Sequence, residues 1–330
     1  MARPTDQAPQ FDHALICGLG SIGRRHLRHL RELGVARVDA MRTGRATLAG
    51  DGAGEPDETF GDLDSALAAG PGVVLVANPT ALHVPTALAA ARAGRHVLIE
   101  KPLGTSPEGC DELLEEVRRQ RVTATVGCNL RFHPALRRVR EWVTAGEPLG
   151  RPVAARAHFG AYLPDWHPWE DYRESYAARR DLGGGAALTH IHEIDYVLWM
   201  FGPPAEVRGL ESLDRPLGTD VDEASAFIVR HAGGVLSTIT LSLAQRPPSR
   251  TLEVAFTGGT AKVDLVDGSV TTLAADGTQT AYPPPQGFDI DDTYRDQDAA
   301  FLEAAGTGGS PEVSLEDAIA ALRVAVAARG

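Results

Sequence analysis

The chain has 330 residues, 43% of them hydrophobic, and a formal charge of -12 from 44 acidic and 32 basic side chains. This length exceeds that of one typical domain and predicts two domains. An acidic chain without a basic block is not expected to bind nucleic acid or acidic membrane surfaces. The polar amino terminus, residues 1–12, has no apolar signal core, and no apolar run approaches the ~18 residues of a membrane span. We therefore expect a disordered tail over 1–12 and a cytoplasmic protein whose three cysteines are reduced.

Strands and helices alternate along the first half of the chain. Continuously apolar runs predict strands at 13–17, 35–41, 73–77, 96–100 and 122–127. Helical patterns occur at 24–34, 84–94 and 107–120. Apolar strands that alternate with helices are typical of a parallel sheet covered on both faces. We predict an α/β domain over 13–128, a Rossmann-type doubly wound parallel sheet.

The pattern changes in the second half. Longer runs with alternating polar and apolar residues occur at 151–161, 223–244 and 250–275, with glycine-containing turns. Such strands predict an antiparallel sheet with one face against helices. Helices are expected at 192–202, 293–306 and 314–328. We predict an α+β domain over 129–330 with a large, mostly antiparallel open sheet for substrate binding and oligomerisation, whose C-terminal helices pack back on the first domain.

The sequence GLGSIG, residues 18–23, has G-x-G-x-x-G spacing between a predicted strand and a predicted helix. In this context Gly18 allows a tight turn, Gly20 admits a pyrophosphate and Gly23 permits close packing of helix against strand. The helix amino terminus attracts the anion. The predicted dinucleotide loop therefore comprises Gly18, Gly20, Ser21, Ile22 and Gly23.

The end of the second strand bears on the choice between NAD and NADP. NAD sites usually carry an acid there, about 20 residues after the glycines. Asp39 is near this distance but lies inside the predicted strand, and Arg42 and Thr43 follow it. A cation and a hydroxyl suit a 2′-phosphate, so NADP is favoured over NAD. The alternative is that Arg42 only stacks on adenine and that both cofactors bind.

Lys101 is one of two lysines in a chain that has 30 arginines. A lysine can release its proton when its surroundings lower its pKa, whereas an arginine stays protonated. Lys101 directly follows the apolar run 96–100, which makes it a candidate proton donor and acceptor. The other lysine, Lys262, lies in an expected hairpin with its charge toward water.

Four motifs, in order, resemble the Gfo/Idh/MocA family of sugar and polyol oxidoreductases. They are GLGSIGRRHL, NPTALHVPTALAAARAGRHVLIEKPL, GCNLRFHP and GGGAALTHIHEIDYVLWMFG, within a match from residue 13 to about residue 202. The resemblance implies hydride transfer between NADP or NAD and a secondary alcohol or ketone of a sugar, nucleotide sugar or cyclitol-like substrate.

The same resemblance implies roles for individual residues. Lys101, in a Glu-Lys-Pro motif, would hold the reacting oxygen and exchange its proton, and Glu100 and a cis Lys101–Pro102 peptide would fix its direction. The residues expected to line the nicotinamide ribose are Asn78, Pro79, Thr80 and His83. Asn129 and Arg131 would lie near the same junction.

The family's second signature is three glycines, an aspartate four residues later and a histidine three residues after that. Here the glycines are 183–185 and the histidine is His192, but Thr189 stands at the aspartate position. A threonine forms hydrogen bonds but cannot neutralise a charge, so a strict Lys–Asp–His relay does not carry over. His190 and Asp195 are close in sequence and are expected to compensate in part for the missing aspartate. The alternative for His192 is a purely structural role instead of a catalytic one. The predicted catalytic residues are Lys101, Thr189 and His192.

Residues 161–185 are rich in aromatic and arginine side chains and have little apolar periodicity. Aromatic faces suit a polyhydroxylated ring, and Arg173 or Arg179 suits a carboxylate or phosphate on an anionic substrate. The residues predicted to bind a sugar-like substrate are Arg131, Trp166, Arg173, Tyr176, His190 and His192. The alternative is a loop that packs against a neighbouring subunit, because an open sheet often buries its bare face in a homodimer or homotetramer.

Three other functions are open. A metal enzyme is disfavoured because His190 and His192, two residues apart on a helix, should not share one ion, and no metal is predicted. An NAD-dependent glycoside hydrolase of the same fold would restore its cofactor in every turnover. A non-catalytic NAD(P)-binding sensor would keep its cellular effect without Lys101.

Overall fold

The computed structural model describes residues 11–42, 54–166 and 171–328. The chain divides into two compact units. The first unit comprises residues up to Gly127 together with Asp291–Glu316, and the second comprises Cys128–Ile290 and the residues from Asp317 onward.

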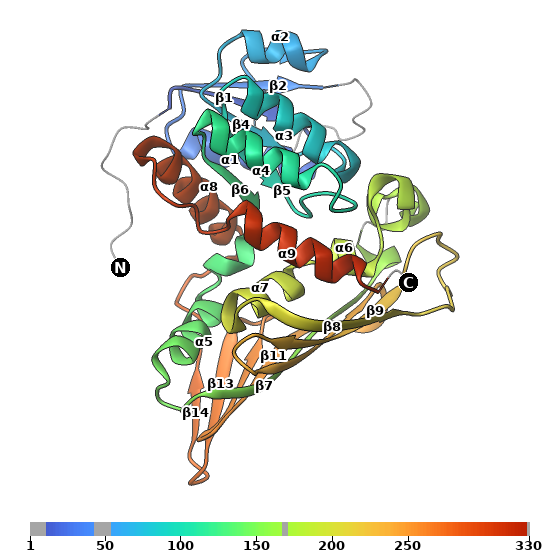
Figure 1. Cartoon of the computed structure of the whole chain (residues 1–330), viewed down its shortest axis with the longest axis vertical. Coiled ribbons are helices and arrows are strands. Elements are labelled where there is room, and N and C mark those ends of the chain that lie inside the picture. Colours follow the sequence, from blue (N-terminus) through green and yellow to red (C-terminus); the bar gives the residue numbers. More distant parts are fainter. Residues whose placement is uncertain (1–10, 43–53, 167–170, 329–330) are drawn as a thin grey trace. The chain divides into compact units, whose positions relative to one another are not determined.

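The first unit is built on a six-stranded sheet (Figure 1). Its strands are β1 (His13–Cys17), β2 (Arg37–Met41), β3 (Thr59–Phe60), β4 (Val73–Val76), β5 (His96–Glu100) and β6 (Ala124–Gly127). They lie in the order β3-β2-β1-β4-β5-β6, and all neighbours are parallel. Consecutive residues of β4 are fully buried, so both faces of the sheet are covered. The predicted doubly wound sheet is confirmed, except that the sequence analysis missed the two-residue β3.

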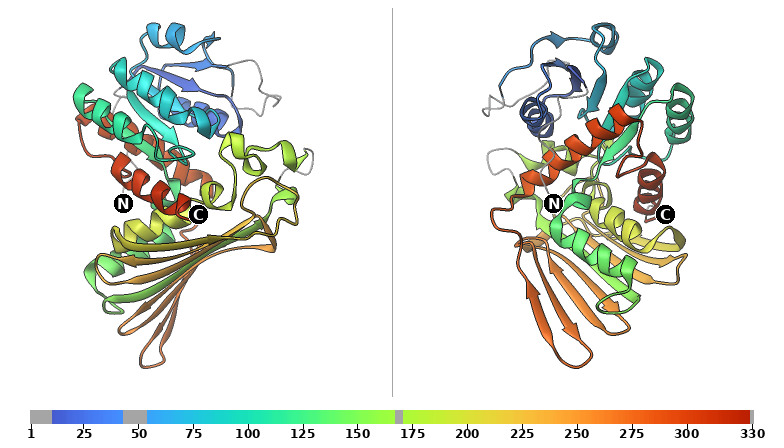
Figure 2. Two further views of the ribbon diagram at one scale, coloured as in Figure 1. Left: turned by 45° about the vertical axis from the view of Figure 1, so that its right-hand side comes forward. Right: turned by 90° about the vertical axis from the view of Figure 1, so that its left-hand side faces the viewer.

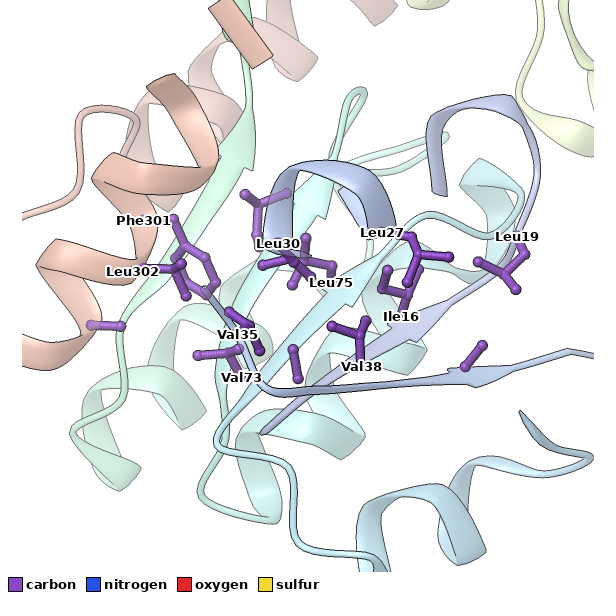
Figure 3. Close-up of a cluster of buried hydrophobic side chains, with 14 residues drawn as sticks. Ile16, Leu19, Leu27, Leu30, Val35, Val38, Val73, Leu75, Phe301 and Leu302 are labelled. Atoms are coloured by element: carbon purple, nitrogen blue, oxygen red, sulfur yellow. The ribbon is translucent and has the colours of Figure 1, made fainter. Parts of the chain in front are cut away.

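Helices of the first unit pack on this sheet. They are α1 (Ser21–Glu32), α2 (Leu63–Ala68), the short 3-10 helix η1 (Thr80–Leu82), α3 (His83–Arg92), α4 (Cys110–Gln120) and α8 (Ile290–Thr307). Figure 3 shows Phe301 and Leu302 of α8 in one apolar cluster with Leu30 of α1 and Val73 of β4. The core of the first unit therefore includes a helix from the C-terminal part of the chain.

The beginning of the described chain also joins this core. Residues 1–10 of the expected disordered tail lie outside the described residues. Phe11, which the prediction included in the tail, packs against the apolar cluster, and its ring centroid lies 5.4 Å from that of His96. Phe11 therefore belongs to the packed part of the first unit.

The second unit is built on an eight-stranded sheet. Its strands are β7 (Pro152–Tyr162), β8 (Pro204–Glu211), β9 (Ala224–His231), β10 (Leu236–Ser242), β11 (Ala244–Phe256), β12 (Gly259–Asp264), β13 (Ser269–Ala274) and β14 (Gln279–Tyr282). They lie in the order β14-β13-β12-β11-β7-β10-β9-β8. Only the pair of β7 and β10 is parallel among these neighbours. The predicted large, mostly antiparallel sheet is confirmed.

One face of this sheet is covered by helices. Along β9, Phe227 and Val229 are buried while Ile228 and Arg230 are exposed, which is the alternation of a sheet covered on one side. Figure 2 shows α5 (Pro134–Ala145, green) and α7 (His192–Phe201, yellow-green) on the same face. Lys262 of β12 is exposed and forms an ion pair with Glu253, as expected for a hairpin charge.

The remaining elements are short 3-10 helices, a four-residue helix and the C-terminal helix. They are η2 (Asn129–Phe132), η3 (Leu163–Asp165), η4 (Tyr172–Glu174), η5 (Tyr176–Ala178), η6 (Arg180–Leu182), α6 (Ala186–Thr189) and α9 (Leu315–Val326). Cys17, Cys110 and Cys128 are buried thiols, and burial raises the pKa of Cys17 to about 12. Within the described residues, no helix combines the length and the apolar character that a membrane span requires.

Candidate active site

Three of the predicted motifs follow neighbouring strands of the parallel sheet. The glycine loop 18–23 follows β1, Asn78 lies two residues after β4, and Lys101 directly follows β5. The strand order reverses between β1 and β4, because β2 and β3 lie on one side of β1 and the later strands lie on the other. In open parallel sheets ligands bind at this reversal, beyond the carboxyl ends of the strands.

Each glycine of the loop has its own steric environment. Gly18 has a φ of +102°, and a β-carbon there would lie 2.6 Å from the carbonyl oxygen of Ala77. A β-carbon on Gly23 would overlap the carbonyl oxygen of Gly18. At Gly20, by contrast, φ is an ordinary -72° and no described atom lies within 4 Å of a β-carbon. Protein packing therefore explains Gly18 and Gly23, whereas the open space at Gly20 fits the close approach of a ligand.

The start of α1 fits an anion at the same place. Its N-cap residue is Gly20, which forms no side-chain capping hydrogen bond, and the first turn contains no acidic residue. The exposed Ser21 and the half-buried Ile22 open this helix. Because amides at a helix amino terminus attract negative charge, the loop and the helix together fit a dinucleotide pyrophosphate.

The end of β2 has a cation rather than an available carboxylate. Asp39 is 1% exposed, and its oxygens lie 3.0 Å from Nε of Arg37 and 2.7 Å from Nε2 of His13. Arg42 is half-buried directly after β2, and its backbone amide donates to the carbonyl of Phe60. Thr43 lies outside the described residues. Asp39 is thus committed within the sheet, as expected from its position inside the strand.

His83 connects the segments that follow β4 and β5. Its ring nitrogens each lie 2.8 Å from a carbonyl oxygen, of Pro102 and of Asn78. Burial lowers the pKa of His83 in spite of these carbonyls, so the neutral ring donates to one of them at a time. The Asn78 amide donates to Thr86, and its own side-chain oxygen is a buried acceptor without a partner in the described structure. That acceptor fits a ribose hydroxyl.

The remaining residues predicted to line the ribose lie at the start of η1. Pro79 is exposed and Thr80 is buried. They follow Asn78 directly, so the segment after β4 has one exposed side chain and one that packs inward. Asn129, 2% exposed, begins η2 in the second unit.

Lys101 is half-buried, and its peptide bond to Pro102 is cis, as expected. Its backbone amide donates to Glu100 Oε2 at 3.2 Å. The Lys101 ammonium contributes to the lowered pKa of His83. Glu-Lys-Pro is therefore contacted on both sides of the lysine: Glu100 accepts the Lys101 amide before it, and His83 Nδ1 lies 2.8 Å from the Pro102 carbonyl oxygen after it.

His26 was missed by the sequence analysis. It lies on α1, three residues after Gly23, and is fully buried between Glu100 and Asp298. A histidine at a buried helix position directly after the glycine motif was a usable signal. Its partner Asp298 is 272 residues away in sequence, so their contact could not be read from local patterns.

In the second unit, the glycine segment 183–185 sets the start of α6. Gly183 and Gly185 have φ values of +89° and +107°. A β-carbon on Gly185 would overlap the carboxylate of Asp222. That carboxylate accepts hydrogen bonds from the Ala187 amide and the Ser225 hydroxyl at 2.9 and 2.6 Å. Gly185 is thus explained by packing against Asp222 and Gly183 by its positive φ, while a β-carbon on Gly184 would overlap the carbonyl oxygens of Tyr176 and Ala177.

The turn into α6 leads to three predicted site residues, Thr189, His190 and His192. Thr189 ends α6, His192 begins α7, and both are buried. The ring centroid of His190 lies 4.3 Å from Phe159 and 5.6 Å from Trp166. The structure thus brings together Trp166 and His190, two predicted substrate ligands. Lys101 belongs to the first unit, so the predicted catalytic set is divided between the units.

Arg131, a predicted substrate ligand, is buried within an ion-pair network of the second unit. It is 1% exposed, and its Nε and Nη2 donate to Asp195 at 3.0 and 2.7 Å, while Nη1 donates to Asp317 at 3.0 Å. Burial opposes the charged form, but Asp195 raises the pKa of Arg131. Both carboxylate oxygens of Asp195 accept hydrogen bonds from Arg131, and the expected compensation for the missing aspartate at position 189 stays a prediction.

In the aromatic-rich segment 161–185, the two arginines predicted as candidate anion ligands lie at the surface. Residues 167–170 of this segment lie outside the described residues. Arg173 and Tyr176 are exposed, and Arg173 stacks on Tyr172 at 4.6 Å from the ring centroid. Arg173 and Arg179 line one surface pocket of the second unit. Each also has a carboxylate neighbour, Arg179 with Asp181 at 2.7 Å, so an anionic ligand would compete with these carboxylates.

Over residues 11–42, 54–166 and 171–328, no group of three or more histidine, cysteine or acidic side chains is arranged to hold a metal ion.

The reversal of strand order, the glycine loop and the lysine after β5 define an NAD(P)-binding oxidoreductase. Two family models agree: the oxidoreductase family with an NAD-binding Rossmann fold matches residues 13–128, and the GFO/IDH/MocA C-terminal domain matches residues 136–262. The chain belongs to the Gfo/Idh/MocA family. It is therefore an NAD(P)-dependent dehydrogenase or reductase that acts on CH–OH groups.

Individual relatives span most of the chain. It is 27% identical over 296 residues to D-xylose 1-dehydrogenase (NADP(+)) 2 of Haloferax volcanii, across 87% of this chain and 86% of that protein. It is 27% identical over 334 residues to myo-inositol 2-dehydrogenase of Thermotoga maritima, across 95% and 94%. Its fold is similar to levoglucosan dehydrogenase in complex with NADH and levoglucosan, with a TM-score of 0.85, 21% identity and coverage of 96% and 95%.

Proposed function

We propose that the chain transfers hydride between NADP and a secondary alcohol or ketone of a sugar, nucleotide sugar or cyclitol-like substrate, with Lys101 as the acid–base residue. The position of Lys101 carries the proposal. It is half-buried directly after β5, in the same parallel sheet whose β1 leads into the glycine loop. Both of its neighbours in the chain have close polar contacts: Glu100 Oε1 lies 3.1 Å from His26 Nε2, and the Pro102 carbonyl oxygen lies 2.8 Å from His83 Nδ1.

The residues of the first unit suit the cofactor in three places. The open space at Gly20 and the start of α1 suit the pyrophosphate, and the Asn78 side-chain oxygen suits a ribose hydroxyl. Arg42 suits a 2′-phosphate, because the nearby acid Asp39 is committed inside the sheet. The Haloferax relative carries NADP in its name, whereas the levoglucosan dehydrogenase structure contains NADH.

In this reaction the protein itself supplies proton exchange at the reacting oxygen and the orientation of Lys101. The bound nicotinamide supplies the hydride acceptor or donor. During oxidation a neutral Lys101 amine accepts the hydroxyl proton, and during reduction the ammonium donates a proton to the carbonyl oxygen. Glu100 and His83 restrict the backbone on either side of Lys101, which keeps its side chain directed.

The second unit suits recognition of a polyhydroxylated ring. Relatives are named for xylose and myo-inositol, which are both rich in hydroxyls. Trp166 and His190 offer two adjacent aromatic rings, tilted by 52° to each other, and Thr189 and His192 add polar side chains nearby in sequence. Arg173, with its neighbour Arg179, would add an anionic preference, for example for a nucleotide sugar.

The proposal is tested with Lys101→Met, Lys101→Arg and the matched control Lys262→Met. We expect both Lys101 variants to lose at least about 10²-fold in kcat, the range of a positioned acid–base group, while cofactor affinity stays within a few-fold. Lys262→Met should behave as wild type, because Lys262 is an exposed hairpin residue of the second unit. Turnover is followed by nicotinamide absorbance with free sugars, cyclitols and nucleotide sugars. Wild-type turnover in Lys101→Met would refute the role of Lys101.

The same assay separates the alternative functions. Glycoside cleavage without a net change in nicotinamide absorbance would indicate the glycoside hydrolase. Cofactor binding without turnover on any substrate, together with an unchanged cellular effect of Lys101→Met, would indicate a sensor.

Association as a homodimer or homotetramer stays a prediction. It is supported by exposed apolar residues on the sheet, Ile228, Leu236 and Leu273.

A further inference from the structure

His26 is a fully buried histidine with a carboxylate beside each ring nitrogen. Its Nδ1 lies 2.8 Å from Asp298 Oδ2 on α8, and its Nε2 lies 3.1 Å from Glu100 Oε1 at the end of β5. Asp298 is 0% exposed and Glu100 is 5% exposed. An ionised carboxylate only accepts hydrogen bonds, so this arrangement calls for a proton on both nitrogens of the ring.

The surrounding charges support that protonation state. Burial by itself lowers the pKa of His26, but the charges and hydrogen bonds of Asp298 and Glu100 raise it to about 10. Burial likewise raises the pKa of Asp298, but His26 and His29 bring it below its ordinary value. At neutral pH the three side chains therefore carry one positive and two negative charges, which leave one net negative charge.

Glu100 links this cluster to Lys101. Its Oε2 accepts the hydrogen bond from the Lys101 backbone amide, while its Oε1 faces His26. A β-carbon added at Gly127 of the neighbouring strand β6 would lie 2.6 Å from Glu100 Oε1. The carboxylate is thus confined by the imidazole, by the amide and by the backbone of β6.

We propose that His26 is a positioning residue for Lys101: as an imidazolium anchored by Asp298, it holds the Glu100 carboxylate against the Lys101 backbone. The inference rests on the proposed function, because it concerns the acid–base residue of that reaction. His26 acts in two ways. It fixes the direction of the Glu-Lys-Pro segment, and it cancels one of the two buried negative charges next to that segment.

The geometry favours a fixed clamp over a path for protons. A continuation from Asp298 to the outside would pass through His29 to Asp291, which is partly exposed. The His29 Nδ1 to Asp298 Oδ2 distance is 3.7 Å, too long for a hydrogen bond. An imidazolium between two carboxylates also binds its proton tightly and releases it poorly.

The charge state is tested directly in the full-length chain. Imidazole nitrogens of ¹⁵N-histidine-labelled protein are titrated by NMR, and His26→Gln assigns the signal. We expect both nitrogens of His26 to stay protonated from about pH 6 to about pH 9, where an ordinary histidine is largely neutral by about pH 8. A neutral His26 at pH 7 overturns the proposal. This result does not depend on finding the substrate.

The positioning role is tested by a double-mutant cycle. His26→Gln leaves two buried carboxylates without their cation, whereas His26→Gln with Asp298→Asn restores one net negative charge and keeps an amide donor for Glu100. We expect His26→Gln to lower kcat at least about 10-fold with the cofactor Kd within about threefold, and the double variant to regain most of that loss. Equal kcat values for wild type and His26→Gln, or no recovery in the double variant, would contradict the role.

Gly127→Ala provides a probe that changes no charge. The added methyl displaces the Glu100 carboxylate and should lower kcat in the same direction as His26→Gln. His13→Gln is the matched control, because His13 also pairs with a buried aspartate, Asp39, but lies at the start of β1 rather than next to Lys101. Its kcat should stay within about twofold of wild type. A loss in His13→Gln equal to that in His26→Gln would overturn the proposal.

The experiments separate the two claims. If the wild-type chain turns over no sugar or cyclitol with NADP or NAD, the proposed function fails, and the NMR titration still decides the charge state of His26. If turnover depends on Lys101 but not on His26, the proposed function stands and the clamp is refuted. All kinetic comparisons are made at a temperature where each variant is folded by circular dichroism.

Discussion

The carbonyl oxygen of Gly18 occupies the space that a β-carbon on Gly23 would need. Any side chain at residue 23 must therefore push α1 away from the end of β1. We predict that Gly23→Ala lowers the free energy of unfolding by about 2 kcal/mol or more, as overpacking in a tight interior does. Urea denaturation measures this loss.

Gly20→Ala is the matched comparison. Gly20 has an ordinary φ and no described atom within 4 Å of its β-carbon position. We expect the free energy of unfolding of Gly20→Ala to lie within about 0.5 kcal/mol of the wild-type value, because the site is open. The variant should bind the dinucleotide at least about 10-fold more weakly, because the added methyl obstructs the pyrophosphate. Isothermal titration with NADP checks the affinity. Unchanged affinity would show that the pyrophosphate does not approach this residue.

Arg42 is expected to distinguish NADP from NAD. Arg42→Ala should lower kcat/KM for NADP by about 10-fold or more, since a charge-assisted contact with the 2′-phosphate is lost. The value for NAD should change by less than about twofold, because NAD has no phosphate there. Steady-state kinetics with both cofactors provides the measurement. An equal loss for both would favour the alternative in which Arg42 only stacks on adenine.

The buried pair of Arg131 and Asp195 should act on stability rather than on substrate binding. Asp195→Asn leaves a buried guanidinium without its main counter-charge, and we predict a loss of about 3–5 kcal/mol in the free energy of unfolding. Arg131→Met with Asp195→Leu removes both charges and should recover most of this loss. Chemical denaturation measures both variants.

The same pair provides a kinetic check on the role of Arg131. Where these variants are folded, the KM for the sugar should stay within about twofold of wild type. A selective rise in KM of the double variant would restore Arg131 as a substrate ligand.

His133 should make the protein less stable in mild acid. Burial, and then the charge of Arg250, lower the pKa of His133 to about 4. The unfolded chain, with an ordinary value near 6.5, takes up a proton that the folded chain excludes, so the stability contributed at neutral pH is lost as pH falls from about 6.5 to about 4. The slope approaches about 1.4 kcal/mol per pH unit for one proton.

His133→Asn tests this pH dependence. The Nδ1 atom of His133 accepts the Ala135 amide at the start of α5, and asparagine is also a good capping residue. The variant should keep its stability at pH 7 and lose less between about pH 6.5 and pH 4. Parallel urea midpoints of the two proteins over this range provide the measurement. Identical slopes would assign the acid sensitivity to other groups.

Much of the architecture was readable from local patterns. Continuous apolar runs separated by helical patterns identified five strands of the parallel sheet, and alternating runs identified most of the antiparallel sheet. The short β3, the short α2 and the half-exposed β8 were missed, because too few buried residues repeat in them. The glycine loop was identified from a turn between a strand and a helix, and Lys101 from a rare residue type at the end of a strand. Both signals lie within a few consecutive residues, so they can be read from the sequence.

The sequence by itself therefore determined the order of the elements, the glycine loop and the lysine after β5. Only the tertiary structure decided what the buried charges do. Arg131 is neutralised by Asp195, 64 residues away, and His26 by Asp298, 272 residues away. A charged side chain points to a ligand or becomes part of the core according to its burial and its nearest opposite charge. Both depend on contacts between residues that are distant in sequence, which no local pattern encodes.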